Sequence, residues 1–417
     1  MKKTLTILLA LILVAALLAG CGGTTQPAQN NTPANNETPA NTDAKANLKV
    51  GFIFLHDENS TYDLNFLNAA KETCAAMGFS EDQFIYRTNI PEGQECYDTA
   101  AELVDAGCTI VFADSFGHED FMIQAAKEFP NVQFCHATGT RAHTEGLSNY
   151  HNAFASIYEG RYLAGVAAGM KLNEMIANGE FTEDEAKIGY VGAFTYAEVV
   201  SGYTSFFLGA RSVCPTATME VTFTGSWYDE TAEKEGANKL INDGCKLISQ
   251  HADSMGAPTA CETAGVPNVS YNGSTKDVAS NTYIISSRIN WEPYYEYVIQ
   301  AVQKGEKMDP DWTGTIATGS VELTELNTAV AAPGTQEAID KAMADLKAGT
   351  LHVFDTAKFT VGGEALTSYM ADVDTDADYT PDTEVISGGY FHESENRSAP
   401  YFDLDIDGIT LLDRNYG

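Results

Sequence analysis

The chain has 417 residues and a formal net charge of −34, from 58 acidic and 24 basic side chains. A negative excess of this size argues against nucleic acid or an anionic lipid surface as the binding partner. The 8 cysteines include no C-x-x-C pair, so the sequence predicts neither a zinc site nor a disulfide framework. We therefore expect no metal or other cofactor.

Residues 1–21 predict a secretory signal. Two lysines precede an apolar run, and Leu18-Ala19-Gly20-Cys21 is similar to the bacterial lipobox, whose cysteine is lipidated and becomes the mature N-terminus. The apolar run is short for a membrane span, which needs roughly 20 apolar residues, so an uncleaved anchor is the weaker alternative. We expect a protein held to the cell membrane by a lipid on Cys21 and facing the extracytoplasmic side.

Residues 22–47 consist mostly of Thr, Asn, Pro, Ala and Gln. Such a segment cannot bury enough apolar surface to fold, and it predicts a flexible linker. The rest of the chain, about 370 residues, is larger than one hydrophobic core usually supports, so two lobes are expected.

Strand and helix patterns alternate along residues 187–254. The expected strands cover residues 187–194, 219–229 and 245–254, and helix patterns with apolar residues three or four apart cover 198–213 and 229–244. This β-α-β-α-β order predicts an α/β fold with a parallel sheet covered by helices on both faces. Ligands bind beyond the carboxyl ends of such strands, so the site is expected there.

The same alternation precedes and follows this stretch. Strands are expected at residues 48–55, 83–86, 108–114, 132–139 and 266–273, and a last strand at 351–359. Residues 312–330 are expected to form a strand pair and the third crossing between the lobes. Helices are expected at residues 65–77, 95–107, 120–129, 258–265 and 338–349. The small residues Gly165, Ala168 and Gly169 predict a closely packed helix in a soluble core.

Four runs carry a family resemblance: KIGYVGAFTYAEVV, GARSVCPTATMEV, GSWYDETAEKEGANKLINDG and ISQHADS. They resemble the basic membrane protein family of substrate-binding lipoproteins, and the likeness extends over roughly residues 48–350. It implies a periplasmic-binding-protein type I fold, in which two Rossmann-like lobes with parallel sheets are joined by three crossings. It also implies that the protein captures a purine nucleoside or nucleobase and delivers it to the permease and ATPase subunits of an ABC importer.

The resemblance also implies where the lobes begin and end. Lobe 1 is expected at residues 48–152 and 288–321, and lobe 2 at 153–287 and 322–362, with closure about the crossings when ligand binds. Residues 363–417 are expected to form an acidic C-terminal extension. Its run D-V-D-T-D-A-D-Y-T, residues 372–380, has the acidic spacing of a calcium loop but lacks the glycine and final glutamate, which favours an exposed acidic loop.

The candidate ligand-binding residues lie mainly at the ends of the expected strands or in the segments that follow them. Flat aromatic faces suited to a heterocycle are Tyr62, Phe66, Phe116, Trp227 and Trp291. Polar groups suited to the ring edge are Asp57, Asp63, Asn65, Ser115, His136, His251, Asp253 and Asn272. Turn or capping roles for Asp57 and Asp63 and a core role for Trp227 remain open. Asn272 stands where many family members carry an aspartate, which leaves ribose recognition open.

An enzymatic function is not expected, because the sequence contains no G-x-S-x-G elbow, P-loop or H-E-x-x-H motif. His251 lies two residues before Asp253 and such a pair can serve as acid and base, so a secreted nucleoside-processing enzyme is the alternative. A ligand-sensing surface receptor or adhesin would use the same pocket.

Overall fold

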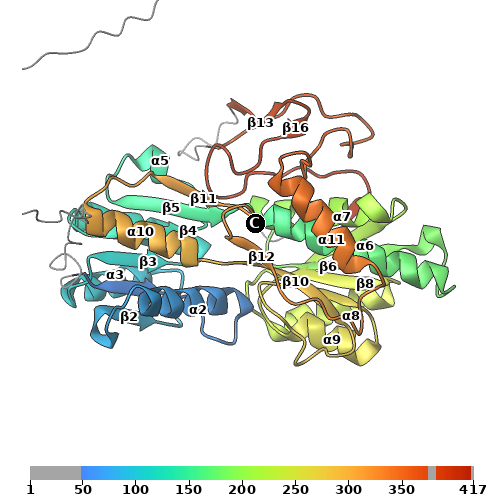
Figure 1. Cartoon of the computed structure of the whole chain (residues 1–417), viewed down its shortest axis with the longest axis horizontal. Coiled ribbons are helices and arrows are strands. Elements are labelled where there is room, and N and C mark those ends of the chain that lie inside the picture. Colours follow the sequence, from blue (N-terminus) through green and yellow to red (C-terminus); the bar gives the residue numbers. More distant parts are fainter. Residues whose placement is uncertain (1–47, 374–381, 415–417) are drawn as a thin grey trace, which may run out of the picture. The chain divides into compact units, whose positions relative to one another are not determined.

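The computed structural model describes residues 48–373 and 382–414 (Figure 1). The predicted signal, Cys21 and the linker lie outside these residues, as does most of the acidic run 372–380. Within the described residues, no helix combines the length and apolar character that crossing a membrane requires. The fold is built on two large sheets, which define the first and second lobes.

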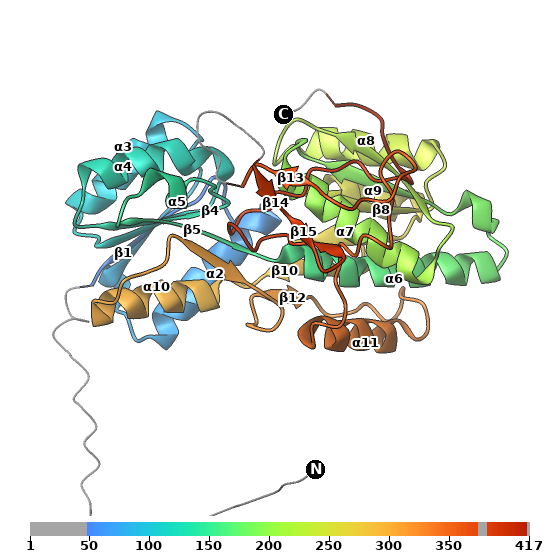
Figure 2. The ribbon, with the colours of Figure 1, turned by 90° about the horizontal axis from the view of Figure 1, so that it is seen from above.

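The sheet of the first lobe has six parallel strands in the order β11-β5-β4-β3-β1-β2. They are β1 (Val50–Ile53), β2 (Phe84–Arg87), β3 (Ile110–Ala113), β4 (Gln133–Ala137), β5 (Tyr150–Ala155) and β11 (Asp311–Gly314). The helices are α2 (Thr61–Ala76), α3 (Gln94–Asp105), α4 (Glu119–Glu128), α5 (Ala142–Glu145) and α10 (Glu292–Lys304). Helices α2 and α10 cover one face of the sheet, and α3 and α4 cover the other (Figure 2).

The sheet of the second lobe has the order β12-β10-β9-β8-β6-β7-β17, with β12 antiparallel to its neighbour and the other pairings parallel. Its strands are β6 (Lys187–Gly192), β7 (Thr218–Phe223), β8 (Leu247–His251), β9 (Asn268–Tyr271), β10 (Tyr283–Ile289), β12 (Val321–Leu323) and β17 (Ile409–Leu411). Its helices are α6 (Ile157–Ala177), α7 (Ala197–Val213), α8 (Glu230–Asn242), α9 (Gly256–Ala264) and α11 (Thr335–Lys347). Short 3-10 turns lie at Glu81–Gln83, Phe116–His118 and Glu183–Glu185.

Glycines bring α6 and α7 into close contact. A Cβ atom on Gly165 would lie 2.0 Å from the carbonyl oxygen of Phe206, and one on Gly209 would lie 2.0 Å from that of Tyr162. Only a residue without a side chain fits at these crossing points. The packing predicted from the small residues is therefore present, and it fixes α7, whose first turn reaches the site.

The chain passes between the two sheets three times, after β5, after β10 and between β11 and β12. The last passage lies within residues 312–330, where two strands and the third crossing are expected. The two strands are β11 and β12, and they belong to different sheets.

One difference from the sequence-based expectation concerns residues 351–359, which form turns and no regular strand. The edge of the sheet beside β7 is occupied instead by β17, from near the end of the chain. Residues 351–359 are held by aromatic packing, because Phe354 stacks on Phe402 with ring centroids 4.3 Å apart. The expectation of a regular strand there was wrong.

The C-terminal segment, residues 382–414, touches both lobes. Ser398 donates a hydrogen bond to Asp311 on β11 of the first lobe (2.8 Å), and Tyr158 on α6 of the second lobe donates one to the carbonyl of Glu393 (3.3 Å). Small hairpins, β13 (Met370–Ala371) with β14 (Thr383–Glu384) and β15 (Ile386–Ser387) with β16 (Tyr390–Phe391), precede β17. Part of the expected extension is thus integral to the second sheet.

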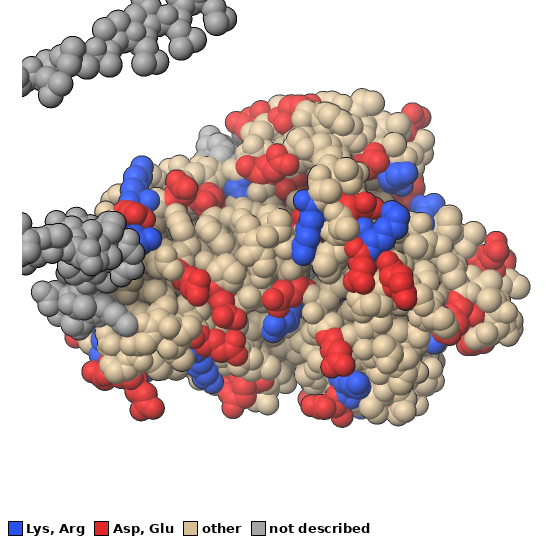
Figure 3. Space-filling model, in the orientation of Figure 1, with Lys and Arg blue, Asp and Glu red and all other residues tan. Residues whose placement is uncertain are grey.

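Acidic side chains are spread over the face shown in Figure 3, with a smaller number of basic side chains between them. They cover both lobes and the C-terminal segment and do not gather in one patch. The large negative charge is therefore distributed over this face as a whole.

Candidate functional site

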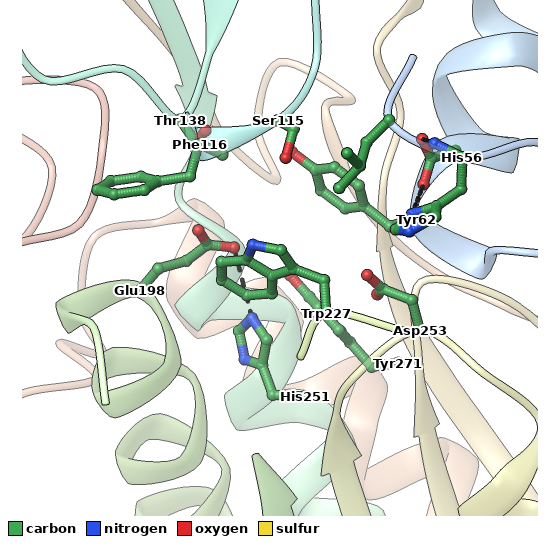
Figure 4. Close-up of a pocket in the computed structure, with 12 residues that line it drawn as sticks. His56, Tyr62, Ser115, Phe116, Thr138, Glu198, Trp227, His251, Asp253 and Tyr271 are labelled. Atoms are coloured by element: carbon green, nitrogen blue, oxygen red, sulfur yellow. Dashed lines mark hydrogen bonds and ion pairs between the residues drawn. The ribbon is translucent and has the colours of Figure 1, made fainter. Parts of the chain in front are cut away.

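A cavity with about 350 Å³ of empty space lies between the lobes (Figure 4). It is lined by Leu55, His56, Tyr62, Asp63, Ser115, Phe116, Thr138, Glu198, Trp227, His251, Asp253 and Tyr271. Most of these residues end a strand or stand in the loop that follows one, in both sheets. The cavity is therefore at the carboxyl ends of the strands, where the sequence places the site.

The loop after β1 is held by Asp63, in the first turn of α2. Asp63 accepts hydrogen bonds from the backbone N–H of His56 (2.7 Å) and from the hydroxyl of Ser60 (2.5 Å), and Ser60 caps the helix. Ser60 is therefore the helix cap, and Asp63 fixes the loop before the helix and also lines the cavity. Asp57 bonds with Asn59 in the loop and does not line the cavity.

A second carboxyl group, that of Asp114, lies buried behind this wall. Burial, with the negative charge of Asp63, raises the pKa of Asp114 well above its usual range. Burial acts in the same direction on Asp63, but hydrogen bonds from His56 and Ser60 outweigh it and lower the pKa of that carboxyl. The two pKa shifts are opposite in direction, so the fold favours a negative charge on Asp63 over one on Asp114.

Three other polar residues of the first-lobe wall are bonded within their own lobe, whereas the Nδ1 atom of His56 is buried without a hydrogen-bond partner among the described residues and lies 3.4 Å from Asp63. The hydroxyl of Tyr62 donates to the carbonyl of Asp114 (2.8 Å), and that of Ser115 donates to Glu92 (2.6 Å). Thr138 donates to the neighbouring carbonyl of Ala137 and has a φ of 68°. A β-branched residue in this left-handed region is strained, and such strain gathers at functional sites.

The second-lobe wall presents polar groups without partners. His251 is 2% exposed, its Nε2 lies 3.4 Å from Glu198, and its Nδ1 has no hydrogen-bond partner among the described residues. Gly202 leaves room for this ring, because a Cβ there would lie 2.5 Å from Nδ1. The hydroxyl of Tyr271 is also buried and without a described partner. Burial lowers the pKa of His251, so a neutral imidazole faces the cavity.

Asp253 is the buried carboxyl of this wall. The side-chain contact recorded for it is with the amide of Asn272, at 3.5 Å. Burial and the charge of Asp63 raise the pKa of Asp253 well above its usual range. A ligand that donates a hydrogen bond to this group would supply the partner that the described residues leave out.

Aromatic rings form the remaining surface of the cavity. Trp227 follows β7, and its ring packs edge-on against Phe194 with centroids 4.9 Å apart. Phe116 of the first lobe stacks on Tyr196 of the second at 4.9 Å. Figure 4 shows the rings of Tyr62, Phe116 and Trp227 around the same space. Trp227 and Phe116 are both half-buried, so each keeps a face available to a ligand.

Some residues predicted for the site lie elsewhere. Phe66 and Trp291 stack on each other at 4.2 Å in the core between α2 and α10, and both are almost fully buried. His136 stands behind the wall, with its Nε2 2.6 Å from the carbonyl oxygen of Ser115. Asn65 and Asn272 contact each other across the lobes and do not line the cavity.

Sequence reasoning did not select five of the lining residues: Leu55, His56, Thr138, Glu198 and Tyr271. The signal for four of them was present, because Leu55, His56, Thr138 and Tyr271 end or directly follow expected strands. Glu198 stands in the first turn of α7 and gave no such signal. It reaches the cavity because α7 packs beside β8, which brings its carboxylate to His251.

The charge of the cavity limits what it can bind. Its lining contains three carboxyl groups and two histidines but no lysine or arginine. An anionic ligand would be buried against like charge without a partner, which is strongly unfavourable. The described residues contain no group of three or more His, Cys, Asp or Glu placed to hold a metal ion. The site therefore suits a neutral or cationic ligand with hydrogen-bond donors.

Comparison with known proteins agrees with this picture. A family model described as ABC transporter substrate-binding protein PnrA-like matches residues 78–347. The purine-binding protein of Brucella abortus is 33% identical over 271 residues, which cover 64% of this chain and 72% of that protein. A putative ABC transporter glucose-binding protein of Haloferax volcanii is 37% identical over 206 residues, so the chain spans about half of that relative, 49%.

Among solved structures, an ABC transporter solute-binding protein from Conexibacter woesei superposes with a TM-score of 0.60. The match covers 73% of this chain and 98% of that one at 20% identity, and it supports the fold. The resemblance and the periplasmic-binding-protein type I fold predicted from the sequence are confirmed. The chain belongs to the family of PnrA-like substrate-binding proteins of ABC transporters.

Proposed function

We propose that the protein binds a purine nucleobase or nucleoside between its lobes and delivers it to the permease and ATPase subunits of an ABC importer. Membership of a substrate-binding family supports the transport role, and the purine-binding relative supports the ligand class. In this proposal the protein is not an enzyme. It works on the extracytoplasmic side of the membrane, held there by a lipid on Cys21.

The observation that carries the ligand class is the meeting of aromatic faces with unpaired polar groups. Trp227 and Phe116 offer flat faces, and an offset-stacked aromatic pair contributes about 0.5–1.5 kcal/mol beyond area burial. Asp253, whose one side-chain contact is 3.5 Å long, lies in the same cavity as the hydroxyl of Tyr271, which has no partner among the described residues. A purine presents a flat face together with N–H donors and ring-nitrogen acceptors along its edge, and it fits both requirements.

A sugar is the ligand that competes with this assignment, because one relative is named as a putative glucose-binding protein. Sugar hydroxyls also bond to carboxylates, so Asp253 alone does not separate the two ligand classes. The pair of half-buried rings favours the purine, because a planar heterocycle can stack against the whole face of an aromatic ring.

The test follows the tryptophan emission of the protein as adenine, hypoxanthine, adenosine, D-glucose or an amino acid is added. We expect a saturable change with at least one purine and none with the sugar or the amino acid. Trp227→Phe should keep most of the affinity measured by calorimetry and lose most of the fluorescence signal, while Trp227→Ala should lose both. A saturable response to glucose with none to any purine would overturn the ligand class.

The absence of catalysis and the lipid anchor have their own tests. Incubation with adenosine should release no adenine, and its release would establish a nucleoside-cleaving enzyme instead. Cys21→Ser should free the protein from the membrane without changing the affinity of the folded part. A Cys21→Ser protein that stays membrane-bound after detergent-free washing would rule out the lipid anchor.

A further inference from the structure

Helix α2 of the first lobe contacts the second lobe directly. The backbone N–H of Thr61 donates to the carbonyl of Asp253 (3.1 Å), and its hydroxyl lies 3.3 Å from the same oxygen. One helical turn later, the side-chain amide of Asn65 donates to the carbonyl of Asn272 (2.8 Å). All four residues are buried, so these hydrogen bonds are shielded from water.

The two donors share one face of α2. Thr61 and Asn65 are four residues apart, which places their side chains one above the other on a helix. The two acceptors are the carbonyls that follow neighbouring strands, Asp253 after β8 and Asn272 after β9. The contact is therefore one helix face against two adjacent strand ends of the second sheet.

The acceptor residues also belong to the ligand-facing part of the second lobe. Asp253 lines the cavity, and the side chain of Asn272 lies 3.5 Å from its carboxyl group. Asn272 has a φ of 63°, a left-handed conformation that asparagine tolerates better than most residues. Its backbone N–H donates to Ser287 on β10, so its carbonyl belongs to a fixed strand end.

We propose that Thr61 and Asn65 form a closure latch, a pair of donors that bond to the second lobe only when the lobes are closed. The latch stabilises the closed state without touching the ligand, since neither residue lines the cavity. The ligand bonds to the side chain of Asp253, and the latch bonds to the backbone carbonyl of the same residue. Both therefore favour the closed arrangement of the lobes. The expected effect of the latch on ligand affinity rests on the binding function proposed above.

A latch and a ligand contact have different consequences. Affinity depends on the population of the binding-competent state, so weakening the latch lowers the affinity for every ligand by one common factor. Loss of a ligand contact instead changes the preference among ligands whose ring edges differ. Because the latch forms after encounter, its loss accelerates dissociation and leaves association almost unchanged.

The test compares Asn65→Ala and Asn65→Asp with Asn68→Ala, an exposed asparagine on the same helix that serves as the control. Asn65→Asp replaces the amide donor by an acceptor facing a carbonyl, and it should weaken binding more than Asn65→Ala. Affinity and dissociation rate are measured for adenine, hypoxanthine and D-glucose, and small-angle scattering reports closure.

We expect Asn65→Ala to weaken the affinity by about tenfold, the effect of a buried hydrogen bond of about 1.4 kcal/mol. The factor should be the same for each ligand that binds and should reside in the dissociation rate, with Asn68→Ala unchanged. Unequal factors would make Asn65 a ligand contact, and unchanged affinity would remove the latch.

If glucose alone binds, the purine assignment fails, but the effect of the latch can still be measured with glucose as the ligand. If no probe binds the wild type, a larger radius of gyration for Asn65→Asp than for Asn68→Ala supports the latch, and equal values overturn it.

Discussion

The two walls of the cavity use their polar side chains in opposite ways. On the first-lobe wall, Asp63, Tyr62 and Ser115 are already bonded to groups of the same lobe. On the second-lobe wall, the hydroxyl of Tyr271 is buried without a described partner, and Asp253 has one long contact. A buried polar group gains most from a new hydrogen bond when it has none, so we expect the second-lobe wall to form most of the new hydrogen bonds with the ligand.

The same contrast governs protonation. The hydrogen bonds to Asp63 lower its pKa, whereas burial raises the pKa of Asp253. The charge of Asp63 is thus built into the fold, while a charge on Asp253 is costly until a donor arrives. The first lobe contributes the ring of Phe116 and the carboxylate of Asp63 to the cavity, and the second lobe contributes the ring of Trp227 and the polar groups of Asp253 and Tyr271.

The largest effect is expected from Asp253→Ala. A hydrogen bond to a charged group contributes about 1.5–3 kcal/mol, so the affinity for a purine should fall by that amount. Calorimetry measures it, with Ser115→Ala as the matched change on the first-lobe wall. Ser115→Ala should leave the affinity nearly unchanged, because its hydroxyl is engaged by Glu92. A folded Asp253→Ala protein with intact affinity would remove Asp253 from the site.

Asp63→Asn should cost stability more than affinity. Its folded pKa is lowered, so its stabilising contribution is present above the unfolded pKa of about 3.9 and is lost as the pH falls through the folded value. At pH 7 we expect the free energy of unfolding to fall by about 1–3 kcal/mol, and the difference from wild type to shrink toward pH 3. Denaturant titrations at both pH values give the comparison. Equal differences at pH 7 and pH 3 would contradict the role of its charge.

In the absence of ligand, Asp253→Asn should change the free energy of unfolding in the opposite direction. The folded pKa of Asp253 is raised, so its contribution is present below the unfolded pKa of about 3.9 and is lost as the pH rises through the folded value. The variant should therefore be more stable than wild type at pH 8, by about 1.4 kcal/mol for each unit of pKa shift, and not at pH 4. Thermal unfolding of the variant and the wild type at the two pH values measures this difference in stability. A variant less stable than wild type at pH 8 would show that neighbouring groups stabilise the buried carboxylate of Asp253 and offset the cost of its burial.

The smallest effect is expected from Tyr271→Phe, which removes one hydroxyl and keeps the ring. If the ligand bonds to that hydroxyl, affinity should fall by about 0.5–1.5 kcal/mol while stability without ligand stays the same or rises. Tyr62→Phe on the opposite wall is the control and should lower stability instead, since its hydroxyl donates to Asp114. If both variants lose affinity equally, the contrast between the walls does not hold.

The sequence alone determined the α/β architecture and the edge at which the site lies. Strand and helix periods are local properties, and ligand sites in such sheets follow the carboxyl ends of strands whatever the rest of the fold does. For this reason Ser115, Trp227, His251 and Asp253 could be named from their positions after expected strands. The family resemblance supplied the type of fold and the transport function in the same way, from contiguous motifs.

Only the tertiary structure decided which side chains of a helix or loop reach the cavity. Asn65 and Phe66 are neighbours on α2, yet one bonds to the second lobe and the other enters the core against Trp291. Glu198 comes to His251 through the packing of α7, and β17 takes a sheet edge 186 positions after β7 ends, from Phe223 to Ile409. These outcomes depend on how separate elements pack and on which partner reaches an edge, and no local period in the chain encodes them.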